Sequence, residues 1–196
     1  MAVDNIESYT QPLQQFVDLF KPLTVLEVGI GEFGYSTRVW LASGAKVTTI
    51  DKNNVNDIAE TIAAEYPDTF TFIHQKSGQA FFDINATFQL IFIDGDHSYD
   101  GAYTDIQWAK RLLAPTGVII LDDYGVEFGV TDVDENGNLT EGHYGVKQAA
   151  DDLFDDRWEI WDTGIDFANG AKVFRRKHVA TPPETKKRMG RPPKYA

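Results

Sequence analysis

Glycines and an aspartate follow two apolar segments that are both typical of buried strands. Residues 24–28 (TVLEV) run directly into Gly29, Gly31 and Gly34, which have the spacing Gly-x-Gly-x-x-Gly. Glycines there allow a tight turn and a close approach of the backbone to a ligand at the start of a helix. Asp51 follows the next apolar segment, 22 residues after Gly29, where a carboxylate can accept hydrogen bonds from both ribose hydroxyls. The spacing therefore predicts a nucleotide-type site.

Two ligand chemistries fit this loop, a dinucleotide and S-adenosylmethionine. A dinucleotide fold usually contains two mononucleotide-binding halves, and here a predicted hairpin ends the sheet after the fifth strand. Glu27 precedes the glycines and puts a negative charge where it would repel a pyrophosphate and attract a cationic methionine group. We therefore expect S-adenosylmethionine as the cofactor, and a nicotinamide-dependent oxidoreductase is the alternative.

Aspartates also follow the fourth and fifth predicted strands. Asp94 follows residues 88–93, and Asp122 and Asp123 follow residues 117–121. Because parallel strands end at the same edge of a sheet, these carboxylates should converge. Two carboxylates at ~4 Å repel by about 4 kcal/mol at an effective dielectric of ~20, and a hard divalent cation removes that repulsion. The sequence predicts a Mg²⁺ site at Asp94, Asp122 and Asp123, with solvated strand ends as the alternative.

Asp96 and His97 lie just after Asp94 and are the candidate general bases. A histidine with a pKa of ~6.5 can accept a proton at neutral pH, and neighbouring carboxylates raise this pKa and orient the ring. A bound cation would also lower the pKa of a substrate hydroxyl, as it does for water. The alternative for His97 is a structural role as the cap of the following helix.

Alternating strands and helices are expected to position these residues. Such alternation is typical of βαβ units and a parallel sheet. The link between the last two strands is too short for a parallel crossover, which needs about a dozen residues, so they should form an antiparallel hairpin at a sheet edge. We expect strands at residues 24–28, 46–50, 69–74, 88–93, 117–121, 157–162 and 171–176, and helices at residues 9–20, 36–42, 56–65, 103–113 and 146–154.

Composition and charge narrow the class of protein. The 196 residues include no Cys and 42% hydrophobic residues, and their net charge is −12. These values fit one globular domain and exclude disulfides, a thiol nucleophile and a thiolate zinc site. Without a long apolar run or a signal-peptide pattern, we expect a cytoplasmic protein that does not bind membranes. The sequence leaves the oligomeric state open, a homo-oligomer included.

The chain resembles the class I S-adenosylmethionine-dependent methyltransferases in the segments EVGIGEFG, TTIDKN, IFIDGDHSYDGAYTDI, VIILDDYG and GVKQAADDLF. It is most similar to the macrocin and novobiocin type of small-molecule O-methyltransferases, over residues 25–177. The resemblance implies a Rossmann-like α/β sheet of seven strands with an antiparallel last strand. It also implies methyl transfer from S-adenosylmethionine to a hydroxyl of a small molecule, such as a sugar or a glycosylated metabolite.

Residue roles follow from the same resemblance. It implies that Glu27, Gly29 and Gly31 line the methionine part of the cofactor. It also implies that Asp51 holds the ribose, that residues 75–77 lie near adenine, that the matching aspartates bind a metal and that Asp96 or His97 is the general base. We assign cofactor binding to Glu27, Gly29, Gly31, Gly34, Ser36, Asp51, Ser77 and Asp94.

Residues 124–144 form a long predicted loop that should cover the acceptor. Residues 132–137 (DVDENG) match the first half of a calcium-binding EF-hand loop, but the twelfth position is His143 instead of Glu. A hairpin that turns at Asn136 and Gly137 is the better interpretation.

Basic residues gather at the end of the chain. Residues 175–196 hold eight Lys or Arg and one Glu, and we divide the chain into a methyltransferase domain at 1–178 and a disordered basic tail at 179–196. Residues 186–194 (KKRMGRPPK) are similar to an AT-hook, which enters the minor groove of DNA. A non-catalytic, nucleic-acid-associated module that uses this tail is thus the alternative function. The acidic body otherwise disfavours nucleic acid as a partner.

Overall fold

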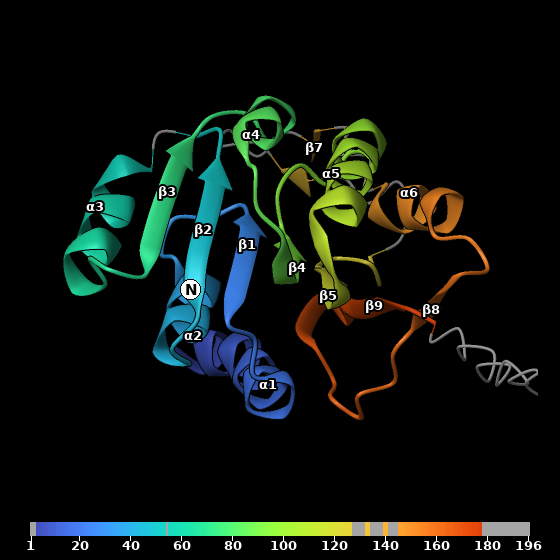
Figure 1. Cartoon of the computed structure of the whole chain (residues 1–196), viewed down its shortest axis with the longest axis horizontal. Helices are drawn as coiled ribbons and strands as arrows, with labels where there is room; N and C mark the ends of the chain where they lie inside the picture. Colours follow the sequence, from blue (N-terminus) through green and yellow to red (C-terminus); the bar gives the residue numbers. More distant parts are fainter. Residues whose placement is uncertain (1–2, 54, 127–131, 134–138, 141–144, 178–196) are drawn as a thin grey trace, which may run out of the picture.

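The computed structural model contains a central sheet with helices on both faces (Figure 1). It describes residues 3–53, 55–126, 132–133, 139–140 and 145–177. In chain order the elements are α1 (Val3–Phe20), β1 (Thr24–Val28), α2 (Tyr35–Ala42), β2 (Lys46–Asp51), α3 (Asn56–Glu65), β3 (Phe70–His74), α4 (Ser77–Asp83), β4 (Phe88–Ile93), α5 (Tyr99–Leu112), β5 (Leu113–Leu121), β6 (Asp132–Val133), β7 (Leu139–Thr140), α6 (Val146–Leu153), β8 (Trp158–Ile160), a 3₁₀ helix (Ala168–Gly170) and β9 (Lys172–Arg176).

The large sheet has seven strands in the order β3-β2-β1-β4-β5-β9-β8. The strands from β3 to β5 are parallel, whereas β9 is antiparallel to both of its neighbours. The predicted α/β fold with an antiparallel hairpin at one edge is therefore confirmed. The chain runs outward from β1 to β3 and then returns to place β4 beside β1. Open α/β sheets bind ligands at such a switch point, beyond the carboxyl ends of the strands.

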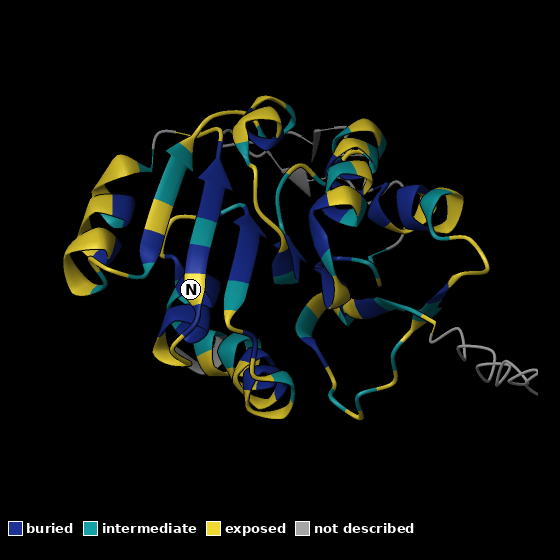
Figure 2. Cartoon of the chain, viewed as in Figure 1, coloured by how far each residue is buried: buried dark blue, intermediate teal, exposed yellow. Residues whose placement is uncertain are grey.

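Alternate residues of the central strands divide between two apolar cores. Leu90 and Phe92 of β4 belong to the core that includes side chains of α1, α2 and α3. Ile91 and Ile93 belong to the opposite core, which includes side chains of α4, α5 and α6. Figure 2 shows the buried residues concentrated in the central strands, whereas the outward sides of α3 and α4 are exposed. Because successive side chains of a strand point to opposite faces of the sheet, a parallel strand that is buried on both faces is apolar along most of its length.

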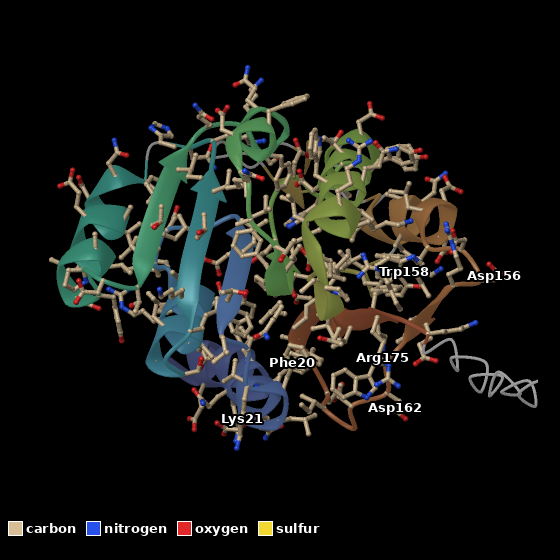
Figure 3. All side chains as sticks on the ribbon, viewed as in Figure 1. Phe20, Lys21, Asp156, Trp158, Asp162 and Arg175 are labelled. Atoms are coloured by element: carbon tan, nitrogen blue, oxygen red, sulfur yellow. The ribbon has the colours of Figure 1, made fainter. Side chains whose placement is uncertain are left out.

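Aromatic contacts attach the edge hairpin to α1. Phe20 ends α1 and packs edge-on against Trp161, with 6.1 Å between the ring centroids. The guanidinium of Arg175 lies 4.8 Å from the same Trp161 ring, and its Nε donates to Glu159 Oε1 at 2.7 Å. Figure 3 shows Phe20 and Arg175 on the same side of the molecule. These contacts hold the edge hairpin of β8 and β9 against the end of α1.

Several elements differ from the prediction. Helix α4 was not predicted, because it has only seven residues and buries only Ala80 and Phe81. Helix α5 begins at Tyr99 instead of residue 103, and its N-cap is Ser98, whose hydroxyl accepts a hydrogen bond from Gly101 N. The proposed capping role of His97 is therefore wrong.

The predicted hairpin of residues 132–140 is present, since β6 and β7 pair antiparallel. Its turn, most of the candidate calcium loop and the predicted basic tail at 179–196 lie outside the described residues. None of the helices in the described part of the chain is long and apolar enough to cross a lipid bilayer.

A buried carboxylate ties β1 to its neighbours. Glu27 is fully buried and accepts hydrogen bonds from Thr37 and Trp40 of α2 and from Thr49 of β2. Burial raises the pKa of Glu27 to about 7, although hydrogen bonds from Thr37, Ser36, Thr49 and Trp40 act in the opposite direction. The carboxylate thus holds β1, which precedes the glycine loop, against α2, which follows it.

The glycine loop touches the end of β4 so closely that residue 29 has no space for a side chain. Gly29 has a φ of +90°, and an added Cβ would lie 1.9 Å from the carbonyl oxygen of Asp94. Gly29 N donates to Ile50 O at 2.8 Å, and Asp94 N donates to Val28 O at 2.9 Å. In contrast, an added Cβ at Gly31 would meet no described atom within 4 Å.

We predict that Gly29→Ala lowers the free energy of unfolding by about 3 kcal/mol or more, because backbone strain of ~1–2 kcal/mol adds to a clash of ~1–3 kcal/mol. The matched control Gly31→Ala also has a positive φ of 63° and should lose only ~1–2 kcal/mol. Urea denaturation of both variants measures the difference. Equal losses would show that the Gly29 contact with Asp94 is not as tight as described.

The ionisation of Glu27 should make stability depend on pH. Its pKa rises on folding from 4.5 to about 7, so the folded state binds more protons than the unfolded state between these values. The free energy of unfolding should therefore fall as the pH rises through this window, by ~3 kcal/mol in all. Denaturation of wild type and Glu27→Gln from pH 4.5 to 8 should show this fall in the difference between them. A difference that stays constant with pH would contradict the prediction.

Candidate active site

A cavity of about 390 Å³ lies at the carboxyl ends of β1, β2 and β4. We call it the first cavity. The strand ends and the glycine loop form one side of it, and the starts of α4 and α5 form the other. Its lining residues are Val28, Gly29, Gly31, Ile50, Asp51, Lys52, Asn53, Lys76, Ser77, Gly78, Gln79, Asp94, Gly95, Asp96, Gly101, Thr104 and Asp105.

A second cavity of about 340 Å³ shares Gly31 and Asp94 with the first, so the two meet there. Helix α1, the glycine loop, the end of β5 and the 3₁₀ helix enclose this second cavity. Its lining residues are Ile6, Tyr9, Ile30, Gly31, Glu32, Phe33, Gly34, Tyr35, Ser36, Asp94, Asp122, Asp123, Ala168 and Asn169. The predicted convergence of strand ends thus produces two adjacent cavities that share Gly31 and Asp94.

Asp51 ends β2 beside the glycine loop. It is buried, its Oδ2 accepts a hydrogen bond from Ile30 N at 3.0 Å, and its Oδ1 accepts one from Asn53 N at 2.8 Å. A carboxylate has about four lone-pair sites, so each oxygen can accept another hydrogen bond from the first cavity. The structure therefore brings Asp51 and the glycine loop together, as the spacing predicts.

Two aspartates that line the second cavity lie beside a histidine. His97 Nε2 lies 3.2 Å from Asp94 Oδ1 and 3.3 Å from Asp123 Oδ2. Burial lowers the pKa of His97, but the hydrogen bond to Asp94 and the charges of Asp123, Asp94 and Asp122 raise it more, so the net pKa is raised. One donor atom from each of Asp94, His97 and Asp123 lies within 4.8 Å of the others. We call these three residues the acidic cluster.

Of the predicted metal ligands Asp94, Asp122 and Asp123, two belong to this cluster, and Asp122 lies outside it. Asp122 is buried and lines the second cavity. Burial, followed by the charges of Asp94 and Asp123, raises the pKa of Asp122 to about 8. The chain leaves the strand here, and Asp123, with a φ of 54°, has its Oδ2 beside His97 Nε2.

The second candidate base, Asp96, lies apart from the cluster and lines the first cavity. Its Oδ2 is 3.3 Å from Lys52 Nζ, and its Oδ1 accepts a hydrogen bond from Ser98 N. Partial burial opposes ionisation, but hydrogen bonds from Ser98 and Lys52 outweigh it and lower the pKa of Asp96. A carboxylate with a lowered pKa is a weak proton acceptor, so the structure favours His97 over Asp96 as the base.

The remaining predicted cofactor residues divide between the cavities. Gly29 and Ser77 line the first cavity, and Gly34 and Ser36 line the second. Glu27 lines neither, and its predicted contact with the methionine group stays a prediction. Glu27 lies within a central strand that is buried on both faces, and its carboxylate accepts hydrogen bonds from internal donors.

Sequence reasoning missed two residues of the site. Tyr9 lines the second cavity and donates its hydroxyl to Asp94 Oδ2 at 3.2 Å. Burial and nearby carboxylates raise the pKa of Tyr9, so the hydroxyl stays protonated. Asp105 lines the first cavity from α5. The position of each residue in its helix could have indicated it. Tyr9 lies one helical turn before the apolar Leu13. Asp105 is a charged residue adjacent to the buried Ile106 in the apolar stripe of α5.

Comparisons with known proteins identify a family. Residues 26–124, about half of the chain, match the family described as "Methyltransferase domain". A search of curated protein sequences found no match. Among solved structures, an O-methyltransferase from Bacillus cereus in complex with SAH is similar, with a TM-score of 0.62 and 23% identity over 89% of this chain and 80% of that chain.

Two further structures have the same fold. The O-methyltransferase TomG from Streptomyces achromogenes, involved in tomaymycin synthesis and in complex with SAM, has a TM-score of 0.62 and 20% identity over 89% of this chain and 78% of that chain. A Burkholderia thailandensis N1-methyltransferase with bound 1,6-didemethyltoxoflavin and S-adenosylhomocysteine has a TM-score of 0.65 and 18% identity over 89% and 80% of the two chains. Because the family match spans half of the sequence and the fold agrees, this chain belongs to the methyltransferase domain family.

Proposed function

We propose that this protein is an O-methyltransferase that transfers a methyl group from S-adenosylmethionine to a hydroxyl of a small molecule. The main support is the pair of cavities that meet at Gly31 and Asp94. The first is lined by Asp51, a carboxylate suited to ribose, and the second is lined by Asp94 and Asp123, which contact the candidate base His97. The similar structures that hold SAH or SAM support the choice of cofactor.

In this proposal the first cavity binds the adenosine part of the cofactor. Asp51 accepts hydrogen bonds from the ribose hydroxyls, while Val28 and Ile50 provide apolar contact. The methionine part passes Gly31, where a side chain would narrow the connection between the cavities. The sulfonium then lies near Asp94, whose negative charge attracts the cation.

The second cavity then binds the acceptor. During methyl transfer the acceptor oxygen forms a bond to the methyl carbon while the carbon–sulfur bond breaks, and the electron pair stays on sulfur to give S-adenosylhomocysteine. The hydroxyl proton goes to His97, which Asp94 holds at 3.2 Å. Tyr9, Phe33 and Tyr35 line this cavity and provide aromatic surfaces for a sugar or another ring. Its volume of about 340 Å³ is in the usual range for small-molecule sites.

The acidic cluster also fits a divalent cation, which would lower the pKa of an acceptor hydroxyl. Two carboxylate oxygens and one imidazole nitrogen within 4.8 Å are a suitable donor set. Mg²⁺ prefers oxygen ligands, whereas an imidazole suits transition metals better. The residues that would hold the cation are Asp94, His97 and Asp123. His97 would then be a metal ligand instead of the proton acceptor.

We predict that wild type binds S-adenosylhomocysteine and that Asp51→Asn binds it about 10- to 100-fold more weakly, because hydrogen bonds to a charged group contribute about 1.5–3 kcal/mol. Asp68→Asn is the matched control, because Asp68 is an exposed carboxylate that lines neither cavity. Isothermal titration calorimetry measures all three proteins. Absence of binding to wild type at millimolar ligand would overturn the proposed function.

The cluster predicts which aspartate affects metal binding. Asp123→Asn should weaken Mn²⁺ binding at least ~10-fold, and Asn tolerates the positive φ at this position. Asp122→Asn should have a smaller effect, because Asp122 is outside the cluster. Electron paramagnetic resonance of Mn²⁺ with the two variants separates these outcomes. Full methyl transfer in EDTA, with no Mn²⁺ bound by wild type, would exclude metal assistance and leave His97 as the base.

A further inference from the structure

The first cavity contains a carboxylate that the proposed cofactor contacts do not use. Asp105 lies on α5, is 1% exposed and lines this cavity. Neither of its carboxylate oxygens has a hydrogen-bond partner among the described residues. Buried polar atoms are nearly always hydrogen-bonded in native proteins, so an orphaned carboxylate beside a cavity indicates a missing donor.

The surroundings of Asp105 make its position costly without a ligand. Burial raises the pKa of Asp105 to about 6, and the charge of Asp96 also raises it. The Ser77 hydroxyl and the Lys52 charge are near enough to oppose this rise, but Ser77 forms no hydrogen bond of normal geometry with Asp105. Since Ala102, Ile106 and Ala109 around it on α5 are buried in the core, an apolar residue would fit this stripe better.

The walls near Asp105 are built from small residues. An added Cβ at Gly95 would lie 3.4 Å from Asp105 Oδ2 and 2.9 Å from Val28 Cγ1. An added Cβ at Gly78, in the first turn of α4, would lie 3.5 Å from Thr104 Cγ2. Glycine at position 95 therefore lets the loop after β4 pack closely against Val28 and Asp105, and Gly78 lies in close contact with Thr104. The space for a flat ring is the first cavity itself, which these residues line.

The donors of the proposed cofactor can be assigned one by one. The ribose hydroxyls match Asp51 at the end of β2. The methionine amino group belongs near Gly31 and Asp94, where the first cavity meets the second. Gly78, Thr104 and Asp105 line the first cavity alone, and the exocyclic 6-amino group of adenine is the donor that remains for them.

We infer that Asp105 is a specificity-determining residue for the adenine ring, and that its carboxylate accepts a hydrogen bond from the 6-amino group. This inference rests on the proposed function, because it needs S-adenosylmethionine or its product in the first cavity. It explains why a carboxylate is present in the apolar stripe of α5 and why its oxygens have no partner within the described chain. A purine without the amino group would leave Asp105 unpaired and should bind more weakly.

The test compares two ligands by calorimetry, S-adenosylhomocysteine and its analogue with hydrogen in place of the 6-amino group. Wild type should bind the analogue about 10- to 100-fold more weakly, as expected for a lost hydrogen bond to a charged group. Asp105→Leu should bind both ligands with similar affinity. Asp105→Asn, whose amide oxygen can still accept, should restore part of the preference. Asp100→Asn is the control, because Asp100 is an exposed carboxylate on the same helix that lines neither cavity, and it should keep the wild-type preference.

The outcomes separate this inference from the function on which it rests. If wild type binds neither ligand, the proposed function fails. If wild type binds both equally, or if Asp105→Leu keeps the wild-type preference, only the role of Asp105 is overturned. Should Asp105→Leu fail to fold, Asp105→Asn decides, since an undiminished preference in that variant would contradict a role for the charged acceptor.

Discussion

The contact between the glycine loop and the end of β4 is the constraint on which the rest of the site depends. The carbonyl oxygen of Asp94 lies where the Cβ of any residue other than glycine at position 29 would be. This contact brings the end of β1 against the end of β4, while Gly29 N also bonds to Ile50 O in β2. Three strand ends thereby share one edge, with Asp51 on one side and Asp94 on the other. Without this contact the two cavities would not meet.

Five carboxylates are buried among the described residues, and three of them, Glu27, Asp122 and Asp105, have clearly different environments. Glu27 is surrounded by hydroxyl and indole donors and supports the loop. Asp122 lies beside Asp94, Asp123 and His97, and burial and the two carboxylates raise its pKa. Asp105 has no hydrogen-bond partner among the described residues. Burial makes an unpaired carboxylate unfavourable, and Glu27 and Asp105 differ in that internal donors satisfy only Glu27.

The sequence was sufficient to predict the strands and their ends, because buried parallel strands are apolar runs and Asp51, Asp94 and Asp122 follow such runs directly. It also predicted the edge hairpin from the short link before Ala171. Helix α4 is not predictable from the sequence pattern, because it is short and only its Ala80 and Phe81 are buried. The prediction of a strand or helix uses the periodicity of apolar residues along the chain. An element as short as α4 has too few residues to show that periodicity.

The details of the site depend on side-chain direction, which periodicity does not determine. Asp123, which has a positive φ, belongs to the acidic cluster, and its neighbour Asp122 does not. Glu27 is buried inside β1, where it contacts Trp40 of α2 and lines neither cavity. Tyr9 reaches Asp94 from the far end of the sequence, 85 residues away. Such contacts follow from the packing of α1 on the sheet and have no local signal.

A crystal structure of the protein with S-adenosylhomocysteine tests the central claim most directly, namely that these strand ends bind the cofactor at one edge. The account predicts ribose hydroxyls on Asp51, the adenine ring between α4 and α5, and the sulfur atom close to Asp94. A ligand bound elsewhere, or a nucleoside placed at the same edge with its ribose turned away from Asp51, would contradict the account.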